Sequence, residues 1–208
     1  MDKQIIKALY GVASKDNVNP ILNGVHFEEQ RCYATDTHLL VIYNEGSEKH
    51  AGKTLSIKGE EIKGQYPPVD KVIPKKLTNP LTLDFGQLQR ACAWWGKQSD
   101  HHIEDKVVLR STCLNIAYLQ KLLSLFVLTH ETREMTLYLN ADKSRPIVAV
   151  SNSFRALLMP CQYAEDSVDE ERPSEDCSVT ISYENLINTY AIESAKPKEK
   201  KPDTMDWL

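Results

Sequence analysis

The 208-residue sequence lacks the marks of several classes of protein. No apolar run approaches the roughly 20 residues that a membrane-spanning helix needs. The first residues, MDKQIIKALYG, contain no apolar core followed by a small-residue cleavage site, so no secretion signal is expected. No glycine-rich phosphate loop, GxSxG elbow or HExxH pair occurs, which argues against an enzyme. We therefore expect a cytoplasmic, non-enzymatic protein with no membrane partner.

Disulfide and metal frameworks are also missing. The five cysteines are odd in number, widely spaced and without a CxxC pair, which indicates free thiols in a reducing compartment. His101 and His102 precede Glu104 and Asp105, but adjacent histidines rarely converge on one ion, so this pattern favours a surface loop. We expect no metal and no cofactor.

Two weak hints of chemistry remain. Asp36 and His38 would share one face of a regular strand, yet a carboxylate that stabilises a turn is the favoured interpretation. Cys113 with a distant histidine could be a nucleophile pair, but nothing near it in the sequence supports this. A small hydrolase is therefore kept as a remote alternative function.

The chain has no strong positive charge. Its formal net charge is −4, whereas nucleic-acid-binding domains are typically basic. The distribution of charge matters more than its sum, because a ring can be acidic outside and basic on its inner surface. The hydrophobic fraction of 41% and the charged fraction of 26% are ordinary for a globular protein, and the length allows one or two domains.

Hydrophobic periodicity predicts an α+β chain with antiparallel sheets and two or three main helices. Helical spacing covers residues 2–15, 86–97 and 114–126. Strand patterns cover 21–29, 32–43, 53–59, 82–85, 105–111, 134–140, 145–151 and 154–161, and a strand followed by a short helix is expected over 178–194. Residues 63–80 hold four prolines and are expected to form an extended connection.

Five segments stand out in order along the chain: NPILNG (19–24), ATDTHLL (34–40), GQYPPVDKVIP (64–74), LNIAYLQKLL (114–123) and RPIVAVSNSFRALLMPCQY (145–163). Together they resemble the bacterial DNA polymerase III sliding clamp, its beta subunit. The first two are similar to part of the second clamp domain, the third to the connection that follows it, and the last two to the third domain. The resemblance implies a DNA-clamp-like α+β fold.

The same resemblance implies a division of the chain. Residues 1–74 correspond to the second clamp domain and residues 75–163 to the third, while residues 164–208 form an acidic linker and a tail. Both clamp-like parts are shorter than full clamp domains. The sequence leaves open whether two trimmed domains or one composite domain result.

In the family, three of these segments converge on an apolar groove that binds a short partner peptide. Carried over to this sequence, the groove would be lined by Leu22, Thr35, Thr37, His38, Leu39, Leu40, Pro67, Lys71, Val72, Leu157, Met159 and Gln162. Most of these residues are types that line concave sites for apolar anchors. The chain departs from the family pattern at Thr37, where the family has glycine, and at Leu39 and Gln162, where it has arginine. These changes would make the groove less cationic.

The resemblance also implies partners. The favoured function is a processivity factor in DNA replication that binds polymerase-type peptides and, as a homo-oligomeric ring, encircles double-stranded DNA. Phosphate contacts without sequence preference would come from basic residues of three helices, namely Lys3, Lys7, Lys15, Arg90, Lys97 and Lys121. The alternative is a peptide-binding adaptor or decoy that does not form a ring.

Two short peptides in the chain are similar to clamp ligands. QKLLSLF (120–126) resembles the Gln-x-x-Ser-Leu-Phe pattern, but its place in a predicted helix favours a core role. MDWL (205–208) is apolar and follows a charged stretch, so we expect it to dock in a clamp-type groove of its own or of a neighbouring chain. Of the consecutive Trp94 and Trp95, one is expected in the core and the other is a candidate for a subunit interface.

Overall fold

The computed structural model describes residues 2–16, 18–98, 104–129, 134–140, 142, 144–162 and 179–195. These residues contain four α-helices, three short 3-10 helices and twelve strands. In chain order the elements are α1 (Lys3–Val12), η1 (Pro20–Asn23), β1 (Val25–Phe27), β2 (Cys32–Thr35), β3 (Leu39–Tyr43), η2 (Glu48–His50), β4 (Lys53–Leu55), β5 (Glu61–Ile62), η3 (Val69–Lys71), β6 (Pro80–Asp84), α2 (Phe85–Trp95), β7 (Lys106–Leu109), β8 (Thr112–Asn115), α3 (Ile116–Leu128), β9 (Glu134–Tyr138), β10 (Ile147–Val150), β11 (Phe154–Leu158), β12 (Thr180–Ser182) and α4 (Tyr183–Ala195).

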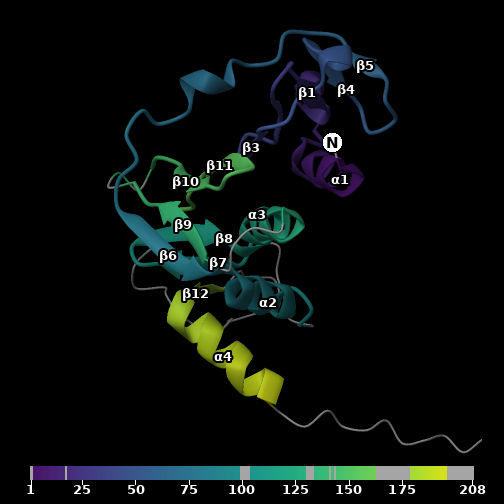
Figure 1. The fold of residues 1–208 in the computed structure, drawn as a ribbon. Helices are drawn as coiled ribbons and strands as arrows, with labels where there is room; N and C mark the ends of the chain where they lie inside the picture. Colours follow the sequence, from purple (N-terminus) through teal and green to yellow (C-terminus); the bar gives the residue numbers. More distant parts are fainter. Residues whose placement is uncertain are drawn as a thin grey trace, which may run out of the picture.

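Most of the strands form one antiparallel sheet of nine, in the order β5-β4-β1-β2-β3-β11-β10-β9-β6. The centre of this sheet is the pairing of β3 with β11, in which Leu40 lies opposite Leu157 and Leu39 opposite Leu158. This pairing joins the strands that precede the proline-rich connection to those that follow it (Figure 1). The division of the chain at residues 74 and 163 stays a prediction.

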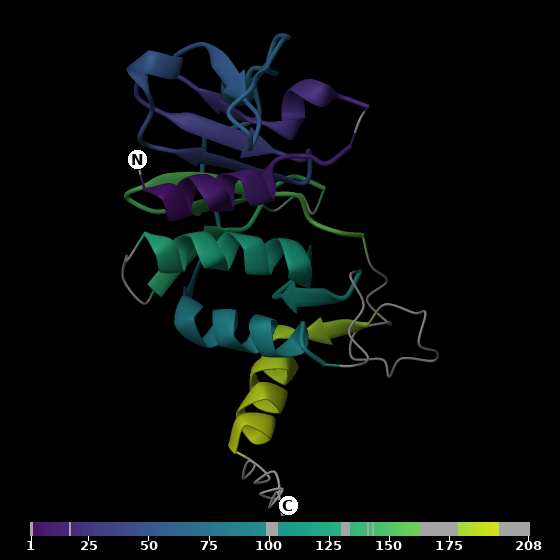
Figure 2. The same cartoon turned by 90° about the vertical axis from the view of Figure 1, so that its right-hand side faces the viewer.

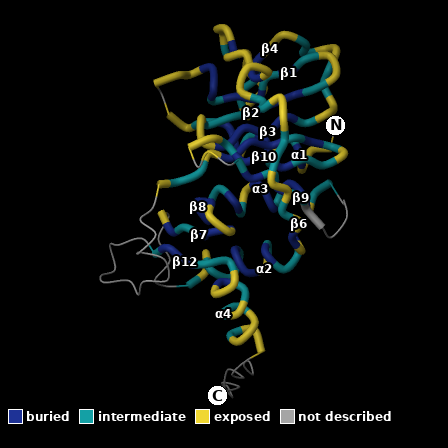
Figure 3. Tube along the Cα trace, turned by 90° about the vertical axis from the view of Figure 1, so that its left-hand side faces the viewer, coloured by how far each residue is buried: buried dark blue, intermediate teal, exposed yellow. Residues whose placement is uncertain are grey.

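Helices α1, α3 and α2 lie side by side over one face of the large sheet (Figure 2). Their apolar faces and the inward residues of the strands make the larger core, with Leu9, Leu88, Leu119 and Phe126 all fully or almost fully buried. Figure 3 shows this buried layer between the helices and the sheet. Each of the three helices begins at a side chain that accepts backbone N–H bonds, because Asp2, Asp84 and Asn115 are their N-caps.

The opposite face of the sheet is covered by η1 and by the proline-rich connection, residues 63–79, which we call the connector. A second, smaller core lies there and includes Leu22, Leu40, Tyr66, Val69 and Leu157. Since side chains alternate along a strand, Leu40 of β3 faces this core while Leu39 faces the helices.

The last described strand, β12, belongs to a smaller sheet of three strands in the order β12-β7-β8. The predicted antiparallel α+β fold is confirmed, and within it strand β12 pairs parallel with β7. The buried carboxylate of Asp105 explains the pairing, since it accepts bonds from Trp95 Nε1 (2.9 Å) and from the backbone N–H of Val179 (2.8 Å). One acidic side chain thus connects α2 to the start of β12.

The predicted helices over 2–15, 86–97 and 114–126 are confirmed as α1, α2 and α3, and the strand-then-helix over 178–194 as β12 and α4. The single strand predicted over 32–43 is wrong: it is a hairpin, β2 and β3, because Asp36 to His38 form a turn. The strand predicted over 21–29 begins later, since Pro20–Asn23 form a 3-10 helix. Strand β8 was not predicted. Among the described residues, no helix is long and apolar enough to cross a bilayer.

Candidate functional site

Three distant stretches of chain meet at one end of the β3–β11 pair. The turn at Asp36–His38 ends β2 and begins β3, and the backbone N–H of Met159, directly after β11, donates to the His38 carbonyl (2.8 Å). The connector crosses the same end of the sheet, where Val69 is buried in the smaller core. The margin of that core is therefore open to solvent between the turn, the end of β11 and the connector.

This opening is a groove of about 270 Å³. Nine of the twelve residues predicted to line a peptide site surround it: Leu22, Thr35, Thr37, His38, Leu40, Pro67, Val72, Leu157 and Met159. The sequence reasoning missed three more lining residues, Pro68, Val69 and Pro146. All three are apolar residues inside segments that carried the resemblance, and this was the signal available in the sequence.

Three predicted residues do not line the groove. Leu39 is fully buried on the helix side of β3, because alternation along the strand turns it away from Leu40. Lys71 is exposed, since a 3-10 helix places Val69 and Val72 on one face and Lys71 on another. Gln162 is exposed beyond Cys161, whose N–H bonds to the Cys113 carbonyl (2.8 Å) and leads the chain away from the groove.

The groove is apolar and partly exposed. Val72 and Met159, from its opposite walls, keep 56% and 37% of their surface accessible to solvent. No Asp, Glu, Lys or Arg is among the lining residues, and His38 is the one titratable side chain there. Exposed apolar walls around a buried floor are suited to receive apolar side chains of a partner.

A salt-bridge cluster fixes the connector wall of the groove. The guanidinium of Arg31 forms two bonds to Asp70 in η3 (2.8 and 2.7 Å) and also contacts Glu28. These bonds lower the pKa of Asp70 and that of Glu28, and they raise the pKa of Arg31. Behind them, Tyr66 packs against the rings of His26 and Tyr33 (centroids 5.1 and 5.2 Å).

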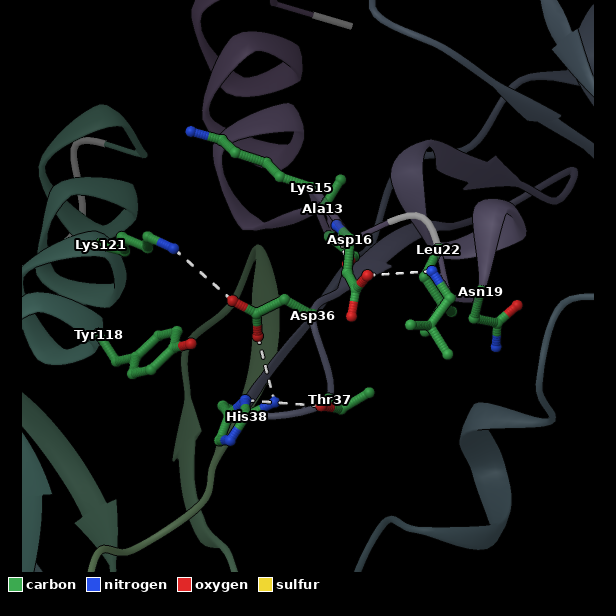
Figure 4. Close-up of a pocket in the computed structure, with 12 residues that line it drawn as sticks. Ala13, Lys15, Asp16, Asn19, Leu22, Asp36, Thr37, His38, Tyr118 and Lys121 are labelled. Carbon is green, nitrogen blue, oxygen red and sulfur yellow. Dashed lines mark hydrogen bonds and ion pairs between the residues drawn. The ribbon is translucent and has the colours of Figure 1, made fainter.

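A second cavity of about 470 Å³ adjoins the groove and shares Leu22, Thr37 and His38 with it. It is more polar, since Lys15, Asp16, Asp36, Tyr118 and Lys121 line it (Figure 4). Lys121 and Asp36 point toward each other across it and form an ion pair (3.6 Å). The His38 ring stacks on Tyr118 (centroids 5.5 Å, planes 17° apart) at the boundary of the two cavities.

The six candidate DNA-binding residues do not form one group. Lys3, Lys7, Arg90 and Lys97 are exposed on or beside α1 and α2. Lys15 and Lys121 instead line the second cavity, and Lys121 is held by Asp36. Helices α1, α2 and α3 contain no Asp or Glu at all, which keeps this layer locally basic in a chain of net charge −4.

The alternative chemical sites gain no support. Asp36 accepts the backbone N–H groups of His38 (3.1 Å) and Leu39 (3.0 Å), so its role in the turn is confirmed. Burial raises the pKa of Cys113 to about 12, which disfavours a thiolate nucleophile. Within the described part of the chain, no cluster of three His, Cys, Asp or Glu could hold a metal; His101 and His102 lie outside it.

The other sequence candidates are also placed. QKLLSLF (120–126) is part of α3 and buries Leu122, Leu123, Leu125 and Phe126, so its core role is confirmed. Trp95 bonds to buried Asp105, while Trp94 lies against Tyr190 of α4 within the same chain (centroids 6.2 Å). MDWL (205–208) lies outside the described residues.

Together, the long antiparallel sheet, the layer of helices on one face and the groove at the connector define a DNA-clamp fold. Solved structures with this arrangement include bacterial sliding clamps, the beta subunits of DNA polymerase III. The Bartonella birtlesii clamp bound to griselimycin matches with a TM-score of 0.60 and 16% identity over 77% of this chain. The Thermotoga maritima beta subunit (0.59, 15%, 77%) and the Helicobacter pylori clamp bound to a DNA ligase peptide (0.59, 15%, 76%) are similar.

The chain spans 62–64% of the length of these three clamps. Comparison of the sequence with protein-family models and with curated proteins gives no significant match. The fold is thus that of the sliding clamp, in a chain that is 15–16% identical in sequence to these three clamps.

Proposed function

We propose that this chain is a clamp-like factor of DNA replication that binds short peptides of replication proteins in the groove. One observation carries the proposal: Leu22, His38, Pro67 and Met159, which come from distant segments, surround a single apolar opening. The Helicobacter pylori clamp, of the same fold, is described with a bound DNA ligase peptide, which supports a peptide as the ligand here.

The composition of the groove indicates what the peptide must contain. A wall of Leu, Val, Pro and Met side chains favours large apolar anchors, and Met adapts to varied partners. Burial of one such anchor contributes about 1.5–3 kcal/mol, whereas micromolar affinity needs a net of about 8 kcal/mol, so several anchors together with hydrogen bonds to the peptide are required. Because no Asp, Glu, Lys or Arg lines the groove, any preference for charged residues of the peptide would have to come from side chains around it, such as Lys71.

The test is direct binding of a fluorescein-labelled peptide with the pattern Gln-x-x-Ser-Leu-Phe, followed by fluorescence anisotropy. We expect Val72→Asp and Met159→Asp each to weaken binding at least about tenfold, since a carboxylate would be desolvated by the anchor. Ile57→Asp is the matched control: Ile57 is 71% exposed, does not line the groove, and should leave affinity unchanged. Equal affinity of all four proteins would place the peptide elsewhere.

Two modes of action are consistent with this groove. As a processivity factor, the chain would close into a homo-oligomeric ring around double-stranded DNA, with the acid-free layer of α1, α2 and α3 toward the phosphates. As an adaptor or decoy, it would bind the same peptides without a ring. The second mode is favoured by the engagement of Lys121 with Asp36, because a paired cation is less available to phosphates. No catalytic role is proposed.

A further inference from the structure

We propose that the groove of one copy binds residues 205–208, MDWL, of a second copy, so that the chain associates with itself through the site that receives partner peptides. This inference rests on the proposed peptide-binding function. Met205, Trp207 and Leu208 would supply the apolar anchors. Self-association would then compete with partner binding and release the groove when a better peptide is present.

The first argument is chemical fit. The lining is apolar apart from two threonines and His38, and it offers Val72 and Met159 to solvent on opposite walls. MDWL places three large apolar side chains within four residues, with Asp206 as its sole charge. Exposed Lys71, next to Val72, provides positive charge near the groove for that carboxylate.

The second argument is elimination among the chain's own segments. QKLLSLF cannot enter a groove, because its four large apolar side chains are at most 2% exposed inside the core of α3. The stretch 163–178, YAEDSVDEERPSEDCS, is strongly acidic and has few large apolar residues. Beyond α4, residues 205–208 are the segment in which three large apolar residues lie within four positions of the sequence.

The third argument is the direction of α4, which favours a second copy. Helix α4 ends at Ala195, and it runs away from β3, β11 and the connector (Figures 1 and 2). The ten residues from Ala195 to Met205 span at most about 33–36 Å when fully extended. Docking in the groove of the same chain would require the residues after Ala195 to turn back along α4, whereas docking in a second copy requires no such turn.

The experiment is complementation between two variants of the full chain, followed by sedimentation velocity. Trp207→Ala keeps the groove and loses the tail anchor, whereas Met159→Asp keeps the tail and loses the groove. We expect the wild type to rise above the mass of one 23.7 kDa chain as concentration increases into the micromolar range. Each variant alone should stay monomeric, and their equimolar mixture should form a 1:1 complex.

Independent variants guard against misfolding and against another interface. Val72→Asp should behave as Met159→Asp does. Ile192→Asp alters the exposed apolar residue of α4 (63% exposed) and should leave association intact. If Ile192→Asp abolishes association, or if the mixture does not form a complex, docking of the tail between copies is overturned. A wild-type chain that stays monomeric, with tighter peptide binding after Trp207→Ala, would show docking within one chain and also overturn it.

The labelled Gln-x-x-Ser-Leu-Phe peptide separates this inference from the proposed function. If Trp207→Ala binds the peptide but no copies associate, the groove function stands and the inference fails. If Trp207→Ala does not bind the peptide while the two variants still form a complex, the groove is specific for MDWL and the inference stands without the replication partner.

Discussion

Thr37 lies at the rim of the groove with a backbone φ of 78°, a conformation that β-branched residues rarely adopt. The clamp motif that this turn resembles has glycine here, and glycine reaches positive φ without a steric penalty. The threonine is held in place by the turn: its N–H bonds to Thr35 Oγ1 (3.0 Å), and Asp36 caps the next two residues. Backbone strain is thus stored beside the groove.

This residue gives a prediction for stability. Thr37→Gly should increase the free energy of unfolding by about 1 kcal/mol, because relief of strain exceeds the greater entropy of glycine in the unfolded chain. Urea unfolding monitored by tryptophan fluorescence measures the change. Thr37→Asn, which tolerates this conformation, should give a smaller gain of the same sign. A loss of stability in both variants would contradict strain at this position.

Among the elements, the connector is the one whose position depends on a few side chains. It contributes Pro67, Pro68, Val69 and Val72 to the groove but pairs with no strand. Arg31, directly before β2, holds it through the two bonds to Asp70, and the buried side chains of Tyr66 and Val69 fix it from inside. Paired hydrogen bonds between guanidinium and carboxylate fix orientation as well as distance.

We therefore predict an effect on binding from residues that do not line the groove. Arg31→Ala and Asp70→Asn should each weaken peptide binding several-fold, because the wall that carries Val69 and Val72 becomes less ordered. The double variant should weaken peptide binding no more than the more severe single variant does, as expected for two partners in one interaction. Anisotropy with the labelled peptide measures all three, and additive effects would show that the two residues act separately.

The same cluster predicts a dependence on pH. The pKa of Asp70 lies below its ordinary value of 3.8 because Arg31 stabilises the carboxylate, so the folded state gains stability from it above that value. This contribution is lost as the pH falls through the lowered pKa, and Glu28 behaves in the same way below 4.5. Acid unfolding of Asp70→Asn should accordingly be less steep than that of the wild type between about pH 4 and 2.

For the whole molecule, a ring on DNA and an adaptor differ in the number of phosphate contacts that they require. The free cations of the helical layer are few: Lys3, Lys7, Arg90 and Lys97 are exposed, and the helices carry no acidic residue to oppose them. In a plot of the logarithm of the binding constant against the logarithm of the salt concentration, each phosphate contact contributes about −0.9 to the slope.

If the chain encircles DNA, binding of a labelled duplex should show a slope of about −3 to −4 per subunit in such a plot, together with an oligomer that persists in Trp207→Ala during sedimentation. Replacing Lys3 and Lys7 by glutamine should make that slope shallower by about two contacts per subunit. Binding with no salt dependence would exclude the phosphate layer. A monomer that binds peptide but no duplex at low salt would assign the adaptor role.

The features of the fold that could be predicted from the sequence are mainly local ones. The spacing of Ile5, Leu9 and Val12 predicted the first helix, because helical periodicity acts within one or two turns. The caps at Asp2, Asp84 and Asn115 explain where the three helices begin. Ordered similarity over five segments was enough to predict the clamp fold and nine of the groove residues. Short-range periodicity is encoded in neighbouring residues and needs no knowledge of distant ones.

Tertiary structure decided which residues within one apolar run face the groove and which face the helices. The register of β3 against β11 turns Leu40 toward the groove and Leu39 into the helical core, although both lie in the same apolar run. The turn at Asp36–His38 interrupts that run, and Asp105 directs β12 into parallel pairing with β7, far away in sequence. These outcomes depend on contacts between segments separated by many residues, and a one-residue shift of register reverses the face of every side chain.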